Sequence, residues 1–498
     1  MSEPAVTEGT VGEASARGRA AATAQGIELR SIDWVPHTER HGKAWHVGPV
    51  WFSGNAELTT MATGVTAISL GGNLLWTMIA LLAGAVFGTF FSAFHSAQGP
   101  QLGLPQMIQS RAQFGYLGVA LLVLPASYIM YAGYNVFNGL LPAEALSNVT
   151  HVSTTVMLIV VTVVALAAAL WGYDLIHRTQ RYLTALFLVV FTAYTIALLV
   201  TVGFPHGAFD LGGFRAGPFL GAFALAVSYQ LSWAPYVSDY SRYLPAAVGQ
   251  QGTFWWTYLG MAISGIWMFW LGAIAAAPIA SQAPGVVDAI RSTGDALFGG
   301  WGAIVLIAAV PALVIILAMN MYGGALVLIT IADSVKKIRP GLRHRVIGIV
   351  VTAVIAFAAS LFSESNADFL TYYNNLLVIL LYLFGPWTAI NLADYYLVRR
   401  GHYAIREIFK PEGMYGRWGW RGLTAYIAGF GASAPFWVVG TWYVGPVARM
   451  LNSTDISFFV GLTLSGLVYL ALARSLDLDA ERRVEAEEGE IASGDLVP

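Results

Sequence analysis

Long apolar stretches recur along the middle of this chain, and each is close to the ~20 residues that a helix needs to cross a bilayer. We delineate twelve of them, separated by short polar segments, and therefore predict an all-α polytopic membrane protein with a single membrane domain. The approximate bounds are 48–72, 74–97, 116–141, 152–172, 182–203, 217–237, 252–279, 301–331, 346–363, 369–393, 422–445 and 456–473.

The first and the sixth stretch depart from the apolar pattern in corresponding places. Polar or proline-interrupted backbone at membrane depth is tolerated where it lines a cavity or is buried in protein. A pair of such interruptions points to the binding site of a transporter. The interrupting residues include Ser53, Gly54 and Asn55 in the first stretch and Ser228, Gln230 and Pro235 in the sixth.

If the core is a tandem repeat of five spans, the odd number forces the second copy to be inverted in the membrane. Both chain ends are polar, and we expect them to be disordered. The expected organisation is a tail over 1–45, a membrane domain over 46–476 with repeats at about 48–203 and 217–398 and appended helices at about 422–473, and an acidic tail over 477–498.

Composition and charge support a membrane protein with a defined orientation. The chain is 57% apolar and only 11% charged, which excludes a soluble globular protein. With both termini in the cytoplasm, every Lys and Arg except Arg215, Arg291 and Arg449 falls on the cytoplasmic side, as expected for a multi-pass protein of the plasma membrane. The dispersed basic residues indicate no nucleic-acid partner, and the absence of cysteine excludes disulfides and cysteine metal sites.

No motif of a known enzyme class is present. The sequence lacks HExxH, GxSxG and a Walker loop, so we expect no enzyme, no ATP-driven pump, no cofactor and no metal site.

The third span presents a polar helical face suited to a flat heterocycle. A tyrosine one turn from an asparagine offers a surface for stacking and an amide that hydrogen-bonds a ring edge. Bonding between helices is the alternative. Gln230 and Trp233, one turn apart on span six, form either the opposite wall or packing contacts. The residues of the face lie at helical spacing: Ser127, Tyr131, Tyr134, Asn135 and Asn138.

Two isolated polar residues lie within apolar spans. Glu57 is about seven residues into span one, where a carboxylate costs ~2.5–3.5 kcal/mol by insertion scales. It is either a protonatable coupling group or close enough to the surface to extend into water. Asn320 in span eight needs a hydrogen-bonding partner, which is either a ligand or another helix.

Two carboxylates lie at the cytoplasmic ends of spans beside arginines. Asp239 is followed by Arg242, and Asp394 by Arg399. We interpret both pairs as ion pairs that anchor an inner gate or loop.

Four segments in order resemble a known family. WFSGNAELTT, GLPQMIQSRAQFGYLG, WAPYVSDYSRYLP and LYLFGPWTAINLADYYLVRRGHY, between Trp51 and Tyr403, resemble the nucleobase:cation symporter family one, the purine and cytosine permeases. The resemblance implies an inverted five-plus-five helix fold with broken helices one and six and a central site between them and spans three and eight.

The resemblance also implies a set of substrate-binding residues. Tyr131 and Asn135 look like the aromatic and amide that hold the base, although family members usually have tryptophan at the first position. Trp233 is our choice for the stacking aromatic of span six, with Tyr229 and Gln230 as alternatives in the same region. The family's other substrate-contacting regions contain Ser53, Asn55 and Asn320.

We infer the coupling ion from a difference between this chain and sodium-coupled relatives, which use hydroxyls on span eight. Residues 302–329 contain no Ser or Thr, whereas Glu57 offers a proton carrier. We therefore predict a secondary active transporter that imports a purine or pyrimidine nucleobase, such as cytosine, with a proton by alternating access. The alternatives are sodium-coupled uptake of a related heterocycle (allantoin, hydantoin, uracil or a vitamin), an amino-acid transporter of the same architecture, and a receptor or channel.

Overall fold

The computed structural model describes residues 33–494 apart from 172, 283, 337, 339–340 and 366–368. Its described part is helical except for loops and one antiparallel hairpin of β1 (Val438–Val439) and β2 (Tyr443–Val444). Helices are expected because they satisfy every backbone polar group internally where no water is available. The prediction of a helical membrane protein is thus confirmed, but the hairpin lies within the stretch 422–445 that was predicted as a span, where the helix ends at Ser433.

The first group of helices covers the predicted spans one to five. It comprises α2 (Val47–Asn55), α3 (Leu58–Ser69), α4 (Leu74–Leu102), α5 (Gln106–Gln109), α6 (Arg111–Phe114), α7 (Tyr116–Gly118), α8 (Leu124–Thr150), α9 (Thr154–Trp171) and α10 (Tyr173–Thr201). A π-helical turn, Val119–Val123, joins α7 to α8.

The second group covers the predicted spans six to ten. It comprises α11 (Ala216–Leu231), α12 (Val237–Ser241), α13 (Gln250–Ala276), α14 (Val286–Asp295), α15 (Trp301–Val335), α16 (Leu342–Ser365) and α17 (Phe369–Leu392). The chain ends with α18 (Trp420–Ser433), α19 (Pro446–Met450), α20 (Ser457–Ala473) and α21 (Leu478–Gly494).

Eight helices of the described residues are long and apolar enough to cross a membrane, or up to nine if α20 and α21 count as one bent span. These eight correspond to the predicted spans two to five and seven to ten. Spans one and six are missing from this count because each is broken into shorter helices. The total of twelve and the inverted repeat are compatible with this arrangement and stay predictions.

Both breaks occur where the sequence indicated them. In span one, α2 ends at Asn55 and α3 begins at Leu58, with Glu57 between them in an extended conformation (φ −152°, ψ 168°). In span six, α11 ends at Leu231, and Pro235 lies in the 3-10 turn before α12. Proline has no amide hydrogen to donate, so the regular hydrogen-bond ladder is interrupted there.

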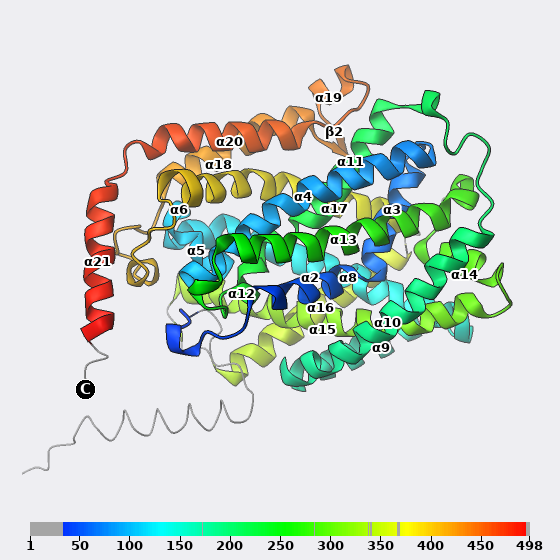
Figure 1. Ribbon diagram of the computed structural model, residues 1–498, viewed down its shortest axis with the longest axis horizontal. Helices are drawn as coiled ribbons and strands as arrows, with labels where there is room; N and C mark the ends of the chain where they lie inside the picture. Colours follow the sequence, from blue (N-terminus) through cyan, green and yellow to red (C-terminus); the bar gives the residue numbers. More distant parts are fainter. Residues whose placement is uncertain are drawn as a thin grey trace, which may run out of the picture.

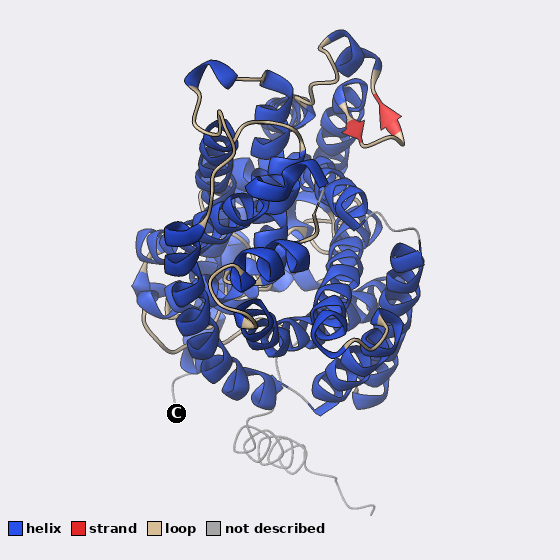
Figure 2. Ribbon diagram, turned by 90° about the vertical axis from the view of Figure 1, so that its right-hand side faces the viewer, coloured by secondary structure: helices blue, strands red, loops and turns tan. Residues whose placement is uncertain are grey.

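Around the centre of the molecule the helices pack in two sets, each of which contains helices from both halves of the chain. α13 contacts α2, α3 and α4, and α4 contacts α11, whereas α15 contacts α8, α9 and α16. Figure 1 shows the long helices side by side, and Figure 2 shows many of them nearly end-on. The described N-terminal segment and α21 lie at the same end of the bundle (Figure 1), which we call the terminal side. The opposite end is the far side.

The expectation of disordered chain ends is wrong for the described parts of both. Residues 33–46 form a strap with two 3-10 turns, held by Val35 N to Gly103 O (2.9 Å) and by Arg40 Nη1 to Pro100 O (2.8 Å). The acidic C-terminal segment forms α21 instead of an extended tail. Residues 1–32 and 495–498 lie outside the described part of the chain.

Candidate functional site

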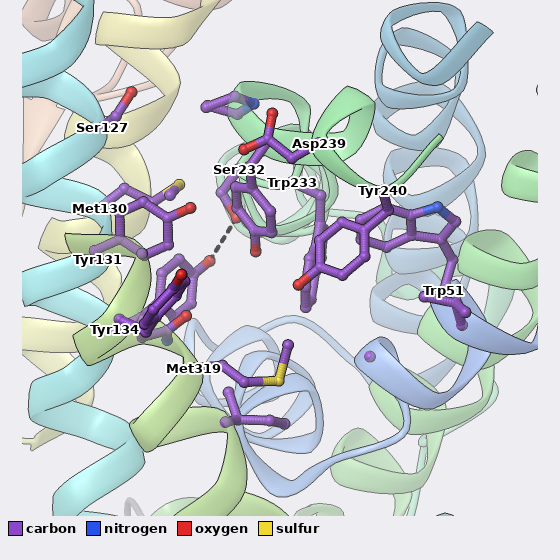
Figure 3. Close-up of a pocket in the computed structure, with 18 of the residues that line it drawn as sticks. Trp51, Ser127, Met130, Tyr131, Tyr134, Ser232, Trp233, Asp239, Tyr240 and Met319 are labelled. Carbon is purple, nitrogen blue, oxygen red and sulfur yellow. Dashed lines mark hydrogen bonds between the residues drawn. The ribbon is translucent and has the colours of Figure 1, made fainter. Parts of the chain in front are cut away.

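A cavity of about 760 Å³ lies between the two breaks and the neighbouring helices α8 and α15. Its mouth is on the terminal side, where exposed residues line it, among them His46 just before α2 and Val50 in its first turn. Its volume is within the range of small-molecule sites, ~300–1,000 Å³. Figure 3 shows Tyr131 and Tyr134 on one side of this space, and Trp233, Tyr240 and Trp51 toward the other.

Aromatic rings form much of the cavity wall. The Tyr131 ring lies 5.5 Å from the Tyr236 ring, centre to centre, with the planes inclined at 34°. On the opposite side, Trp51 contacts Trp233 at 5.8 Å and Tyr240 at 5.2 Å, both edge to face. Such surfaces suit a flat ring, because an aromatic ligand buries its face by stacking.

Four of the five residues predicted to share a polar face on span three line the cavity: Ser127, Tyr131, Tyr134 and Asn138. The hydroxyl of Tyr134 bonds that of Ser232 on the broken span six (2.9 Å; dashed in Figure 3). Asn135 differs, since it is buried outside the lining and its amide atoms have no protein partner among the described residues. Its proposed role in binding stays a prediction.

Glu57 lines the cavity from the break in span one. Its Oε1 accepts a hydrogen bond from the Tyr229 hydroxyl (3.0 Å), which also bonds the hydroxyl of Thr60 (2.6 Å). Its Oε2 is buried and has no hydrogen-bond partner in the described part of the chain. The carboxyl group is therefore held by one oxygen, while its second oxygen is buried and unsatisfied although Glu57 lines the cavity.

Hydroxyl groups connect the helices between Glu57 and the far side of the bundle. Thr59 donates to Asn138 Oδ1 (2.7 Å), and the Thr63 hydroxyl bonds that of Tyr373 (2.9 Å). All of these side chains are buried. The cavity thus opens to the terminal side and ends at this hydroxyl layer.

Asn55 and Gln230 were predicted to contact a ligand, but the structure places them elsewhere. Asn55 Nδ2 donates to Gln230 Oε1 (2.8 Å), and both side-chain amides also donate to the backbone oxygen of Met261 on α13. Neither residue lines the cavity. They tie the two broken helices to each other and to α13, an interhelical role that the sequence had left open for Gln230 but not for Asn55.

The remaining predicted binding residues do line the cavity. Ser53 belongs to α2, Trp233 to the break of span six, and Asn320 to α15. Ser53 donates to the backbone oxygen of Val50 (2.9 Å).

The two predicted anchors on the terminal side have different surroundings. Asp239 and Arg242 line the cavity mouth; Asp239 accepts a bond from the backbone of Gln106 (2.9 Å), and Arg242 donates to the backbone oxygen of Asp33 (3.2 Å). Asp394 is fully buried in an ion pair with Arg399, as expected for an anchor.

Sequence reasoning did not name several cavity residues. Trp51, Tyr236 and Tyr240 lie within the quoted motifs, so the motifs themselves contained the signal. Met319 and Gly323 on α15 also line the cavity; Gly323 is three residues from Asn320 and so shares its helix face, whereas Met319 is its immediate neighbour and had no such indication.

Comparisons with known proteins identify the family. The family model described as permease for cytosine/purines, uracil, thiamine, allantoin matches residues 34–461. The putative purine-cytosine permease YxlA of Bacillus subtilis (strain 168) is 36% identical over 450 residues, which cover 90% of this chain and 96% of that protein. The purine-cytosine permease fcyB of Emericella nidulans is 25% identical, covering 90% of this chain and 88% of that protein.

A solved structure shares the fold. Mhp1, a nucleobase-cation-symport-1 family transporter in a closed conformation with bromovinylhydantoin bound, superposes with a TM-score of 0.72 at 16% identity, covering 92% of this chain and 99% of that one. The same protein in an inward-facing conformation gives a TM-score of 0.71. With the family model matching most of its length, this chain belongs to the nucleobase:cation symporter family one, a family of multi-pass membrane permeases.

Proposed function

We propose that this permease imports a purine or pyrimidine nucleobase, such as cytosine, together with a proton across the plasma membrane. The observation that carries the proposal is that aromatic rings and the buried carboxyl of Glu57 line one cavity between two broken helices, whereas the other lining carboxyl, Asp239, lies at the mouth. Stacking contributes ~1–3 kcal/mol per base. With a few buried hydrogen bonds this supports micromolar affinity, near −8 kcal/mol.

Glu57 is the proposed proton carrier. A charged carboxylate at this depth is costly without a cationic partner, and the bonds described for Glu57 come from a phenol. A proton taken up from outside makes the group neutral while the base binds. Loss of that proton to the cytoplasm then accompanies release of the base. A base N–H that bonds Oε2 would join substrate and proton at the same group.

The terminal side is the cytoplasmic side in this proposal, because nearly all Lys and Arg then lie inside. The cavity is accordingly open to the cytoplasm, and the hydroxyl layer around Thr59 and Thr63 separates it from the outside. Alternating access requires this layer to open while the terminal side closes around the base.

The surroundings of the break in span one favour a proton over sodium. A cavity of about 10 Å³ lies between Ser53 and Ala56 of the break, Thr184 of α10, and α15. From α15 it is lined by Ala312, Ile315 and Ile316, whose side chains offer no oxygen. Hard cations take several oxygen ligands, whereas only the hydroxyls of Ser53 and Thr184 reach this space among the lining side chains.

The test is uptake of radiolabelled cytosine, competed by other bases, into proteoliposomes with an imposed proton or sodium gradient. We expect a proton gradient alone to drive accumulation; a potential of 100 mV supplies ~2.3 kcal/mol per charge, roughly fiftyfold. Glu57→Gln should abolish accumulation but retain exchange of base across the membrane. The matched control is Glu144→Gln, a partly buried glutamate of α8 outside the cavity.

The two parts of the proposal fail separately. Accumulation that follows sodium and ignores the proton gradient would refute proton coupling but leave the substrate class intact. Absence of transport and of competition by any purine or pyrimidine would refute the substrate class.

A further inference from the structure

The Tyr131 ring rests against the backbone of α15 at Gly323. A Cβ atom built on Gly323 would lie 2.7 Å from both Cε1 and Cζ of Tyr131 and 3.0 Å from its hydroxyl oxygen. Carbon atoms in van der Waals contact are about 3.5–4.0 Å apart. No side chain therefore fits at position 323 while the Tyr131 ring keeps its place.

The ring has few ways to yield to a side chain there. α15 is continuous from Trp301 to Val335, so its backbone is held by regular hydrogen bonds on both sides of Gly323. On another side, Tyr131 meets the ring of Tyr236 from span six. Because Tyr131 and Gly323 both line the cavity, the free direction for the ring is into the cavity, toward the side of Trp233 (Figure 3).

A glycine within a helix also has a measurable cost. Glycine is less favourable than alanine by ~0.8–1.0 kcal/mol in a helix interior. Two adjacent glycines, Gly323 and Gly324, occur in the middle of α15. Gly324 has a packing reason, since a Cβ there would lie 2.9 Å from the methyl group of Thr352 on α16. At position 323 the reason for a glycine is the contact with the Tyr131 ring.

We propose that Gly323 is a positioning residue that sets the width of the ring-binding slot, by which we mean the part of the cavity beside Tyr131 where a flat base would lie. Because it has no side chain, Gly323 lets the Tyr131 ring pack against α15 and leaves this slot wide. This rests on the proposed function, in which a flat base enters the slot beside Tyr131. A methyl group at 323 moves the Tyr131 ring into the cavity by about the overlap, on the order of 1 Å. A planar ligand needs contact distance on both faces, so a slot narrowed by that amount binds it more weakly.

The test compares Gly323→Ala with Gly324→Ala in uptake of the preferred base. Both substitutions remove a helical glycine from neighbouring positions of α15, but only the first faces the cavity. We expect Gly323→Ala to raise KM at least tenfold with the maximal rate per transporter within about twofold. Gly324→Ala should leave KM within twofold and change only expression or the melting temperature.

A double substitution distinguishes an effect of Gly323→Ala on the slot from a general effect on folding. In the Tyr131→Ala background no ring remains for a Cβ at 323 to displace. Adding Gly323→Ala there should change KM less than twofold. An unchanged KM for Gly323→Ala alone, or the same fold-increase in both backgrounds, would overturn the inference while the proposed function stands.

A ligand-free structure of the Gly323→Ala protein gives a readout that does not depend on the substrate. We expect the Tyr131 ring to be displaced from α15 toward the cavity. A ring that keeps its position would overturn the inference even if the parent protein proved to carry no nucleobase. Failure of the proposed function is recognised independently, by absence of base transport in the parent protein.

Discussion

Two of the polar regions buried in this apolar bundle differ in how completely their polar groups are satisfied. In the charge cluster on the terminal side, Asp394 accepts bonds from Tyr403 (2.8 Å), Tyr469 (2.7 Å), Gln113 and Arg399. Arg399 also donates to both oxygens of Glu481 on α21 (2.9 and 3.0 Å). Every charge in this cluster is paired, although Asp394 is fully buried.

The central cavity is the opposite case. Glu57 Oε2 and the indole nitrogens of Trp51 and Trp233 are buried without a protein hydrogen-bond partner among the described residues. An unsatisfied buried polar atom costs about 1–3 kcal/mol, so its retention needs a reason. In this comparison the paired polar groups hold the fold, whereas the unpaired groups belong to residues that line the cavity, where we propose that a ligand binds.

The largest expected effect comes from removing the shared cation of the charge cluster. Arg399→Ala leaves the carboxylates of Asp394 and Glu481 buried without their positive partner, and breaking a buried pair costs about 3–5 kcal/mol. We expect a much lower melting temperature in detergent and poor expression. Arg400→Ala, the exposed neighbour, should stay within about 0.5 kcal/mol. Equal stability of the two variants would contradict a structural role for the cluster.

Removing an aromatic wall of the cavity should weaken binding of the base in the protein that folds. Trp233→Ala removes a stacking surface that contributes ~1–3 kcal/mol per base. KM for the preferred base should therefore rise roughly tenfold to a hundredfold. Trp255→Ala changes an exposed tryptophan of α13 and should leave KM unchanged. If the two variants transport the base equally well, Trp233 is not part of the site.

The sequence was sufficient to predict the helical fold, both breaks and the side of α8 that faces the cavity. Spacing on a helix determines which residues share a face, so Tyr131, Tyr134 and Asn138 could be grouped. Spacing does not determine how that helix is rotated against its neighbours. For this reason Asn135, adjacent to Tyr134, could not be separated from the lining residues.

Contacts between distant segments were beyond prediction for the same reason. Asn55 and Gln230 are polar residues at two breaks, and their chemistry suits a ligand as well as each other. Their bond depends on the approach of α13, whose Met261 oxygen accepts from both. Likewise the pair of Asp394 and Arg399 was visible in one motif, but Glu481 lies 82 residues beyond Arg399 in a segment whose charge is typical of a solvated tail.

The smallest expected effect separates buried from exposed charge on one helix. Glu481 and Glu485 lie one turn apart on α21, and both face basic residues of the segment between α17 and α18. Glu481 is buried against Arg399, whereas the pair of Glu485 and His402 (3.2 Å) is partly exposed to solvent. Glu481→Gln keeps the shape of the side chain but removes the charge that Arg399 requires. It should weaken the docking of α21 onto the helix bundle by about 1–3 kcal/mol.

Glu485→Gln should change docking by less than about 1 kcal/mol, because exposed ion pairs contribute little and are screened by salt. Hydrogen–deuterium exchange of the α21 amides measures this local opening directly. We expect exchange to accelerate in Glu481→Gln and to match the parent in Glu485→Gln. Acceleration of similar size in both variants would show that α21 is held by its total charge and not by the buried contact with Arg399.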